Sequence, residues 1–171
     1  MENKGYVKNK LQTVLIELLK DHNLEDISIT MVCKMSQVSR ASFYRNYTSL
    51  EDIIVKANKN LLSTIDINQR YFDFDKVESI LYALATYAIL YRDYYSLLHR
   101  RKLNNTILIA LKDLLIKHEE TKSNKDKYLT AFIFFGIHGI ISSWIRNGMQ
   151  ETPKELVLTI RNKESLYSSL N

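Results

Sequence analysis

Apolar residues recur every three or four positions at the start of the chain, which is the spacing of one face of an α-helix. The first such segment covers residues 4–22, and its apolar positions are Val7, Leu11, Val14, Leu15, Leu18 and Leu19. Two shorter segments follow, one starting after Ser28 and ending near Met35, the other starting after Ser39. Each of these serines is a favourable N-cap. The pattern predicts one long and two short helices, with a tight turn at residues 36–38.

The rest of the chain has the same helical spacing. Thr48 and Glu51 form a Thr-x-x-Glu capping box, which predicts a helix over about residues 49–62. A later start, Thr152-Pro153-Lys154-Glu155, combines a cap, a proline in the first turn and a capping-box glutamate. Between them, helices are predicted over residues 75–99, 103–118 and 128–149. Strand-like alternation is not seen, so the predicted fold class is all-α.

Composition agrees with an all-helical cytoplasmic protein. The 171 residues include four glycines and one proline, so few positions interrupt a helix. The single Cys33 excludes an internal disulfide framework and a four-cysteine zinc site. The first ten residues lack the apolar core of a signal peptide. We expect a small N-terminal domain over residues 1–48 and a larger helical domain over residues 49–171, connected by the helix at 49–62.

The formal charge of +5 permits a phosphate-bearing partner but does not identify one. Residues 1–48 contain seven basic and five acidic side chains, whereas residues 100–127 contain eight and four. The basic surplus is therefore not concentrated at the N-terminus, and charge alone does not locate a nucleic-acid site.

Two short helices joined by a three-residue turn form a helix-turn-helix. We expect the first helix to dock through Ile29, Val32 and Cys33. Val38 should fill the angle between the helices, and Phe43 should point inward. The first turn of the second helix, from which side chains reach base edges in a major groove, contains Arg40, Ala41 and Ser42. The Ser39 and Ser42 hydroxyls suit phosphate oxygens, and Tyr44 adds a phenol hydroxyl at the rim. A helical hairpin that only packs, or one that binds protein, is the alternative.

These segments resemble the DNA-binding domain of the TetR family of bacterial transcription regulators. The matching residues are 28–33, 38–47 and 49–53, and the spacing of Phe43, Tyr44 and Tyr47 is the most specific part. The resemblance implies a homodimeric repressor that binds a palindromic double-stranded operator. It also implies that a small-molecule effector in the larger domain releases or adjusts the operator.

The resemblance further implies roles for single residues. Ser28, Ser39, Tyr44 and Asn46 would hold phosphates, and Arg40, Ala41 and Ser42 would read or approach bases. Two positions depart from the family. Ser36-Gln37 stands where the family usually has Ala-Gly, and Leu50 stands where a phosphate-contacting lysine is common. Loss of that lysine would lower affinity and salt dependence by about one phosphate's share.

Residues 135–149 and 152–156 resemble the C-terminal domain of a TetR subgroup. The resemblance implies that the last two helices pair with their copies as a four-helix dimer interface. The residues assigned to this interface are Gly136, Ile140 and Trp144.

Tyrosine density in the larger domain motivates an effector-pocket hypothesis. The pocket is assigned Tyr87, Tyr91, Phe135 and His138, because a pocket needs a few polar groups among apolar walls. The same side chains would serve equally well in plain core packing.

The uncharged run from Tyr128 to Ile145 has 18 residues, which is long enough to raise the question of a membrane span. The run contains four polar residues, and the sequence has no second uncharged run of this length. Both observations argue against a membrane span. A helix that is apolar all round is also expected where one face meets a core and the other a dimer partner. We therefore expect no membrane partner.

The sequence displays no serine–histidine–aspartate order, glycine-rich phosphate loop or carboxylate pair. We predict that the protein is not an enzyme and has no cofactor and no metal site. One alternative is a helical ligand- or protein-binding module that has lost sequence-specific DNA reading, which Leu50 and the modest N-terminal charge favour slightly. The other is an enzyme in the larger domain, which would need an acid/base set that the sequence does not display.

Overall fold

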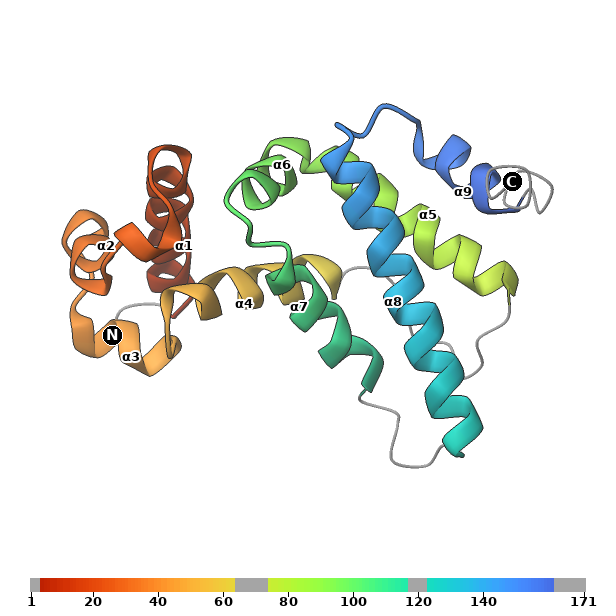
Figure 1. Cartoon of the computed structure of the whole chain (residues 1–171). Coiled ribbons are helices and arrows are strands. Elements are labelled where there is room, and N and C mark those ends of the chain that lie inside the picture. The colour runs from red at the N-terminus through yellow and green to blue at the C-terminus, as the bar shows by residue number, and fades with distance from the viewer. Residues whose placement is uncertain (1–3, 64–73, 117–122, 162–171) are drawn as a thin grey trace. The chain divides into compact units, whose positions relative to one another are not determined.

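The computed structural model describes residues 4–63, 74–116 and 123–161, and the regular elements in these ranges are all helices (Figure 1). The all-α prediction is confirmed. The elements are α1 (Lys4–Asp21), the short 3-10 helix η1 (Leu24–Asp26), α2 (Ile29–Ser36), α3 (Arg40–Asn46), α4 (Leu50–Leu62), α5 (Phe74–Leu90), α6 (Arg92–Arg100), α7 (Asn105–Ile116), α8 (Asn124–Arg146) and α9 (Pro153–Arg161).

The predicted helix over residues 75–99 is two helices, α5 and α6, which meet at Tyr91. The Tyr91 amide still donates to the Tyr87 carbonyl at 3.0 Å, and the Tyr95 amide donates to the Tyr91 carbonyl at 3.1 Å. Because helical hydrogen bonds continue on both sides, the spacing of side chains does not reveal the break. The end of the predicted helix over residues 103–118 lies outside the described residues.

The start of α4 differs by one residue from the predicted capping box. Ser49 is the N-cap, and its hydroxyl oxygen accepts from the Asp52 amide at 3.1 Å. The Asp52 carboxylate accepts from the Thr48 amide at 2.9 Å. Asp52 is thus the acidic residue of the capping box, a role predicted for Glu51. The Glu51 side chain is exposed. Two overlapping Ser/Thr-to-acid spacings occur here, and the local sequence alone did not choose between them.

The chain divides into two compact units. The first comprises Met1–Thr64 and Arg100–Leu111, and the second comprises Ile65–His99 and Lys112–Asn171. This division differs from the predicted boundary after residue 48, because α4 belongs to the first unit. Residues 100–111, hereafter the return segment, join the first unit although residues 65–99 of the second unit precede them.

Helix α1 packs against α2, α3 and α4 in the first unit. Its buried side chains recur at helical spacing and are Val7, Leu11, Leu15, Leu18 and Leu19. Phe43 of α3 has no exposed surface, and burial of a phenylalanine side chain stabilises a fold by about 1.5–3 kcal/mol. This single ring therefore supplies much of the energy that docks a seven-residue helix.

The return segment is fastened to the first unit by apolar burial and by one buried polar pair. Leu103, Ile107 and Leu111 are buried. Thr106 is fully buried. Its hydroxyl donates to the Leu103 carbonyl at 2.6 Å and accepts from the side-chain amide of Asn58, on α4, at 3.2 Å. A buried polar group that loses its partner costs about 1–3 kcal/mol, so this pair ties α4 to the return segment.

In the second unit, α5 packs against both α8 and α9. The Arg92 guanidinium donates to the Met149 carbonyl at 2.6 Å, just beyond the end of α8. The predicted start of α9 is confirmed. The Glu155 carboxylate accepts from the Thr152 amide at 2.8 Å, and the Thr152 hydroxyl oxygen accepts from the Glu155 amide at 3.3 Å.

Residues Lys127–Arg146 of α8 have a mean hydropathy of 1.6 and could cross a membrane by length and composition alone. Core helices of soluble proteins pass the same test. Only 33% of the apolar window is buried, so much of this helix presents apolar side chains outward.

Gln37 closes α2 in the left-handed conformation, with φ of 56°. Its amide donates to the Lys34 carbonyl at 3.3 Å, and the Val38 amide donates to the Cys33 carbonyl at 3.0 Å. This is the Schellman arrangement, in which glycine is usual because a Cβ is strained there. The buried Val38 fills the angle between α2 and α3, as predicted.

We expect Gln37→Gly to stabilise the protein by up to about 1 kcal/mol, because relief of strain exceeds the added flexibility of the unfolded chain. Gln37→Val should destabilise it, because a β-branched residue fits this conformation poorly. Urea unfolding at neutral pH measures both changes. If the glycine variant were less stable than the valine variant, the conformation assigned to this turn would be wrong.

Candidate nucleic-acid interface

Serine caps set the geometry of the helix-turn-helix. The Ser28 hydroxyl oxygen accepts from the Met31 amide at 3.1 Å, and the Ser39 hydroxyl oxygen accepts from the Ser42 amide at 3.1 Å. Both predicted N-caps are therefore found in place. Each hydroxyl keeps its own hydrogen to donate, and both serines are exposed.

The outward side of α3 combines small and basic side chains. Arg40, Ala41, Tyr44 and Arg45 are exposed, and Ser42 is half-buried. The Tyr44 ring stands edge-on to Phe43 with centroids 5.3 Å apart, which orients an otherwise exposed side chain. A duplex backbone can approach such a surface closely, because Ala41 and Ser42 hardly project from the helix.

Arg40 lies between the first turns of α2 and α3. Its Nη1 donates to the Thr30 hydroxyl oxygen at 3.4 Å, a long bond between two exposed side chains. Such a bond is easily exchanged for a stronger acceptor, because hydrogen bonds to anionic or bidentate partners are shorter and stronger. The Arg40 guanidinium therefore lies near the start of α3 and can exchange Thr30 for another acceptor.

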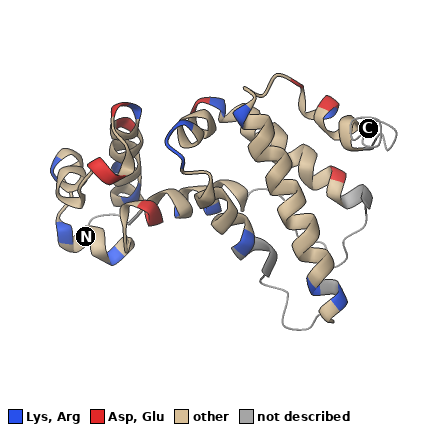
Figure 2. Ribbon diagram, in the orientation of Figure 1, with Lys and Arg blue, Asp and Glu red and all other residues tan. Residues whose placement is uncertain are grey.

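The local charge is more favourable than the total for residues 1–48 indicates. Residues 28–47 contain Lys34, Arg40 and Arg45 and no acidic side chain, and all three are exposed. Four of the five acids in the earlier count lie outside this segment, in α1 (Glu17, Asp21) and η1 (Glu25, Asp26). Figure 2 shows the basic positions on α2 and α3 and the acidic ones on α1, η1 and the start of α4. Helix α1 also carries basic side chains, among them Lys8, Lys10 and Lys20, so the acid-free basic surface is confined to α2, α3 and the turn between them.

Asn46 ends α3 and is already engaged with its own helix. Its side-chain amide donates to the Ser42 carbonyl at 2.8 Å, and its main-chain carbonyl accepts from Lys56 at 2.8 Å. One amide hydrogen of Asn46 remains for another acceptor. If Asn46 contacted a phosphate, its side-chain amide would bind the phosphate and the Ser42 carbonyl at the same time.

Lys56 and Asp52 form a clasp between the end of α3 and the start of α4. The Lys56 Nζ lies 2.8 Å from the Asp52 carboxylate and 5.2 Å from the centre of the Tyr47 ring. Together with its bond to the Asn46 carbonyl, this ammonium joins three groups around the connection. The clasp therefore holds the angle between α3 and α4.

Sequence reasoning missed this clasp. The four-residue spacing of Asp52 and Lys56 on one helix was a visible signal for an ion pair. The bond to the Asn46 carbonyl was not visible, because it depends on the angle between α3 and α4. The absence of a lysine at position 50 also has a structural correlate: Leu50 is buried, with 8% of its surface exposed. Residue 50 therefore contributes to the hydrophobic core of the first unit.

The clasp gives Asp52 an altered acidity. Partial burial by itself raises the pKa of the Asp52 carboxyl, but hydrogen bonds from Lys56 and Thr48 and the charge of Lys56 outweigh it, so the pKa is lowered. Burial raises the pKa of the neighbouring Tyr47 phenol, which stays neutral. The stabilisation from Asp52 is present above its unfolded pKa, about 3.9, and is lost as pH falls through the folded value.

The tyrosines assigned to an effector pocket are brought together in part. The Tyr87 and Tyr91 rings lie 5.4 Å apart. Burial raises the pKa of the Tyr94 and Tyr95 phenols, and for Tyr95 the nearby Tyr87 and Tyr91 add to the effect. Tyr95 therefore belongs to the same cluster, and the four-residue spacing of Tyr87, Tyr91 and Tyr95 was the signal for it.

The two α8 residues assigned to the pocket differ from each other. The His138 Nε2 lies 3.2 Å from the Ser142 hydroxyl oxygen on a half-buried part of the helix. Phe135 is 59% exposed, with its ring 5.1 Å from that of Phe134. A ring so exposed lies at the surface of the second unit, and among the described residues no ring-to-ring contact joins it to the tyrosine cluster.

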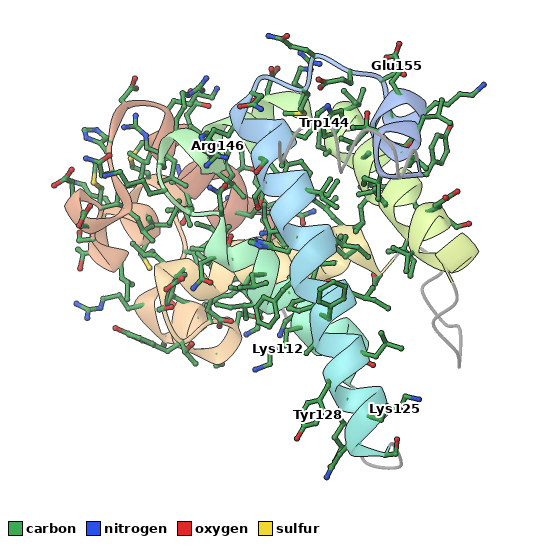
Figure 3. All side chains as sticks on the ribbon, turned by 45° about the vertical axis from the view of Figure 1, so that its right-hand side comes forward. Lys112, Lys125, Tyr128, Trp144, Arg146 and Glu155 are labelled. Atoms are coloured by element: carbon green, nitrogen blue, oxygen red, sulfur yellow. The ribbon has the colours of Figure 1, made fainter. Side chains whose placement is uncertain are left out.

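The three residues assigned to a dimer interface also separate. Gly136 is exposed and Ile140 is half-buried, whereas Trp144 retains 3% exposure inside the second unit. The Trp144 indole N–H is buried and has no acceptor within the described part of the chain. Figure 3 shows Tyr128 projecting outward from the first turns of α8. Trp144 is a core residue, and the surface available to a partner lies on the opposite face.

Within the described ranges, no group of three histidine, cysteine, aspartate or glutamate side chains converges as a metal site would require. Cys33 is buried on the docking face of α2, and burial raises the pKa of its thiol.

Residues 74–162, just over half of the chain, match the family model of the TetR-type transcriptional regulator C-terminal region. A search of curated proteins found no match.

We expect Asp52→Asn to lower stability at pH 7 by about 1 kcal/mol and to reduce the loss of stability below about pH 5, because the titrating member of the clasp is gone. Lys56→Met should lower stability at pH 7 by a similar amount. Thermal unfolding across a pH series measures both. Glu51→Gln is the matched control, since its exposed carboxyl adjoins Asp52. Equal behaviour of the Glu51 and Asp52 variants would exclude the clasp as the source.

Proposed function

The chain belongs to the TetR family of transcriptional regulators, and on this premise we propose that it is a homodimeric repressor that binds a palindromic DNA operator under the control of a small-molecule effector. The observation that carries the proposal is the surface of α2 and α3. It combines capped helix starts, small outward side chains and three exposed basic residues without an acid. These are the features that allow a helix to enter a major groove against a phosphate backbone.

In the proposed complex, the start of α3 faces base edges and the surrounding hydroxyls hold phosphates. Arg40 is the base-reading residue, since its long bond to Thr30 leaves the guanidinium available. Ala41 and Ser42 permit close approach. The residues proposed to hold phosphates are Ser28, Ser39, Tyr44 and Asn46. The clasp of Lys56 supports this arrangement indirectly, because a reading helix must keep its angle when it is loaded.

A dimer is supported by the outer face of α8. Tyr128, Phe132 and Phe135 are 74%, 77% and 59% exposed and recur at helical spacing. Gly136 and Gly139 follow on the same side, and a Cβ at either would meet nothing within 4 Å. Monomeric proteins rarely expose such a contiguous apolar strip. We propose that this strip and Ile140 meet the same surface of a second copy across a two-fold axis.

Two-fold symmetry connects this interface to the operator. Two α3 helices related by the axis would read half-sites about 34–36 Å apart. An effector changes the affinity for DNA only if it binds one separation of these helices better than another. We propose the cluster of Tyr87, Tyr91 and Tyr95 as part of the effector site, with His138 as a further polar group. A regulator of this kind acts on DNA in the cytoplasm, without an enzymatic activity, a cofactor or a membrane partner.

The second candidate is a helical module that no longer reads DNA. The buried Leu50 favours it, because a phosphate-contacting lysine is missing at the start of α4. This candidate predicts that the protein selects no DNA sequence.

Selection of the purified protein against randomised DNA duplexes at two salt concentrations tests the proposal. An enriched inverted repeat, bound less tightly at higher salt, is the expected result. Weak salt-sensitive retention without an enriched sequence would reject the proposal in favour of the second candidate.

We expect Arg40→Ala to reduce discrimination between the enriched duplex and one altered at the contacted base by about 1–3 kcal/mol. Competition titrations with the two duplexes measure this difference. Tyr44→Phe is the matched comparison: it should weaken both duplexes alike, because a lost phosphate contact carries no sequence information. An equal loss on all duplexes for Arg40→Ala would move Arg40 to the phosphate contacts.

We expect Phe132→Glu to shift the protein from dimer to monomer, because the variant buries a charge in an apolar interface. Sedimentation velocity over a range of concentrations measures the shift. Tyr82→Glu is the matched control, since Tyr82 is also an exposed aromatic residue of the second unit, on α5. Dimers that survive in the Phe132 variant would place the interface elsewhere.

A further inference from the structure

The C-terminus of α1 is completed by a residue eighty positions away. Helix α1 ends at Asp21 without the glycine that commonly closes a helix, and its last carbonyls need donors. The His22 amide reaches the Leu18 carbonyl at 2.9 Å. The next two carbonyls, of Leu19 and Lys20, both accept from the guanidinium of Arg101 in the return segment.

The contact is made by all three nitrogens of Arg101. Its Nε lies 2.6 Å from the Leu19 carbonyl oxygen, and its Nη1 lies 3.2 Å from the Asn23 side-chain oxygen. A planar guanidinium offers these donors in a fixed fork, which a lysine ammonium does not. Its charge also faces the negative end of the α1 dipole. One side chain therefore determines where α1 stops and how the chain turns toward η1.

The backbone beside Arg101 is held in an uncommon conformation. Lys102 has φ of 59°, in the left-handed region that favours glycine. A non-glycine residue keeps this conformation only where the surrounding structure demands it. Here the burial of Leu103 and the Asn58–Thr106 pair hold the following residues of the return segment. The turn delivers Arg101 to α1 from one side and Thr106 to α4 from the other.

This contact bears on DNA binding because α1 packs against α2, α3 and α4. Both ends of the return segment continue into the second unit, at His99 and at Lys112. We propose that Arg101 is a positioning residue for DNA binding, which sets α1, and through it the helix-turn-helix, according to the state of the return segment. This inference rests on the proposed function, since it requires that α3 reads DNA.

The test compares Arg101→Gln and Arg101→Lys with Arg100→Gln, whose exposed guanidinium is the adjacent matched control. Thermal unfolding first confirms that each variant is folded. Affinity for the enriched duplex is then titrated over a salt series. Arg101→Gln should lose about tenfold in affinity with an unchanged salt slope, because the lost bonds are internal and no phosphate contact is removed. Arg101→Lys should recover part of the loss, and Arg100→Gln should resemble wild type.

Amide hydrogen exchange provides a second readout that does not depend on DNA affinity. Peptides covering residues 17–26 should exchange faster in Arg101→Gln alone, and duplex binding should slow exchange in residues 100–111 of the wild type but not of this variant. A wild-type affinity in Arg101→Gln overturns the inference, as does a salt slope reduced by about one charge, which would make Arg101 a phosphate contact. Failure of the wild type to enrich any duplex would instead reject the proposed function, and this inference with it.

Discussion

The shortness of α2 and α3 is the constraint on which the first unit depends. Helix α2 has eight residues and α3 has seven, and a helix leaves four amides and four carbonyls unpaired at its two ends. Most backbone groups of α3 would therefore lack partners if it stood alone. Three side chains supply some of these partners: Ser39 at the start of α3, Asn46 at its end and Lys56 from α4. The helix-turn-helix is thus held at its ends as much as by its core.

In this arrangement, the residues that hold α3 in place differ from the residues that it exposes. Phe43, Val38 and Leu50 are buried, and Lys56 and Asp52 are engaged with each other, so these residues determine the angle of α3. Arg40, Ala41 and Tyr44 remain at the surface, where substitution has little effect on the fold. The replacement of a common lysine by Leu50 follows the same division, because it exchanges a surface contact for core packing.

In the second unit, one helix has apolar side chains on both its buried and its exposed face. Its long helix α8 buries Ile137, Ile141 and Trp144 on one side and exposes Tyr128, Phe132 and Phe135 on the other. An isolated chain gains nothing from the outer face, because apolar surface in water is unfavourable. A second copy is the partner that the family membership and the small residues Gly136 and Gly139 favour. The fold therefore uses one face of α8, and the proposed dimer would use the opposite face.

The sequence by itself determined the all-helical class, the serine caps at Ser28 and Ser39, the start of α9 and the helix-turn-helix. These depend on local spacing and on bonds between residues three or four apart, which a linear pattern displays. Tertiary structure alone decided that residues 100–111 join the first unit, that Lys56 reaches the end of α3, and that Trp144 is a core residue. Helical periodicity shows which side chains share a face, but not which of two apolar faces the chain buries. Contacts between residues far apart, such as Arg101 with Leu19, depend on how the helices pack in three dimensions.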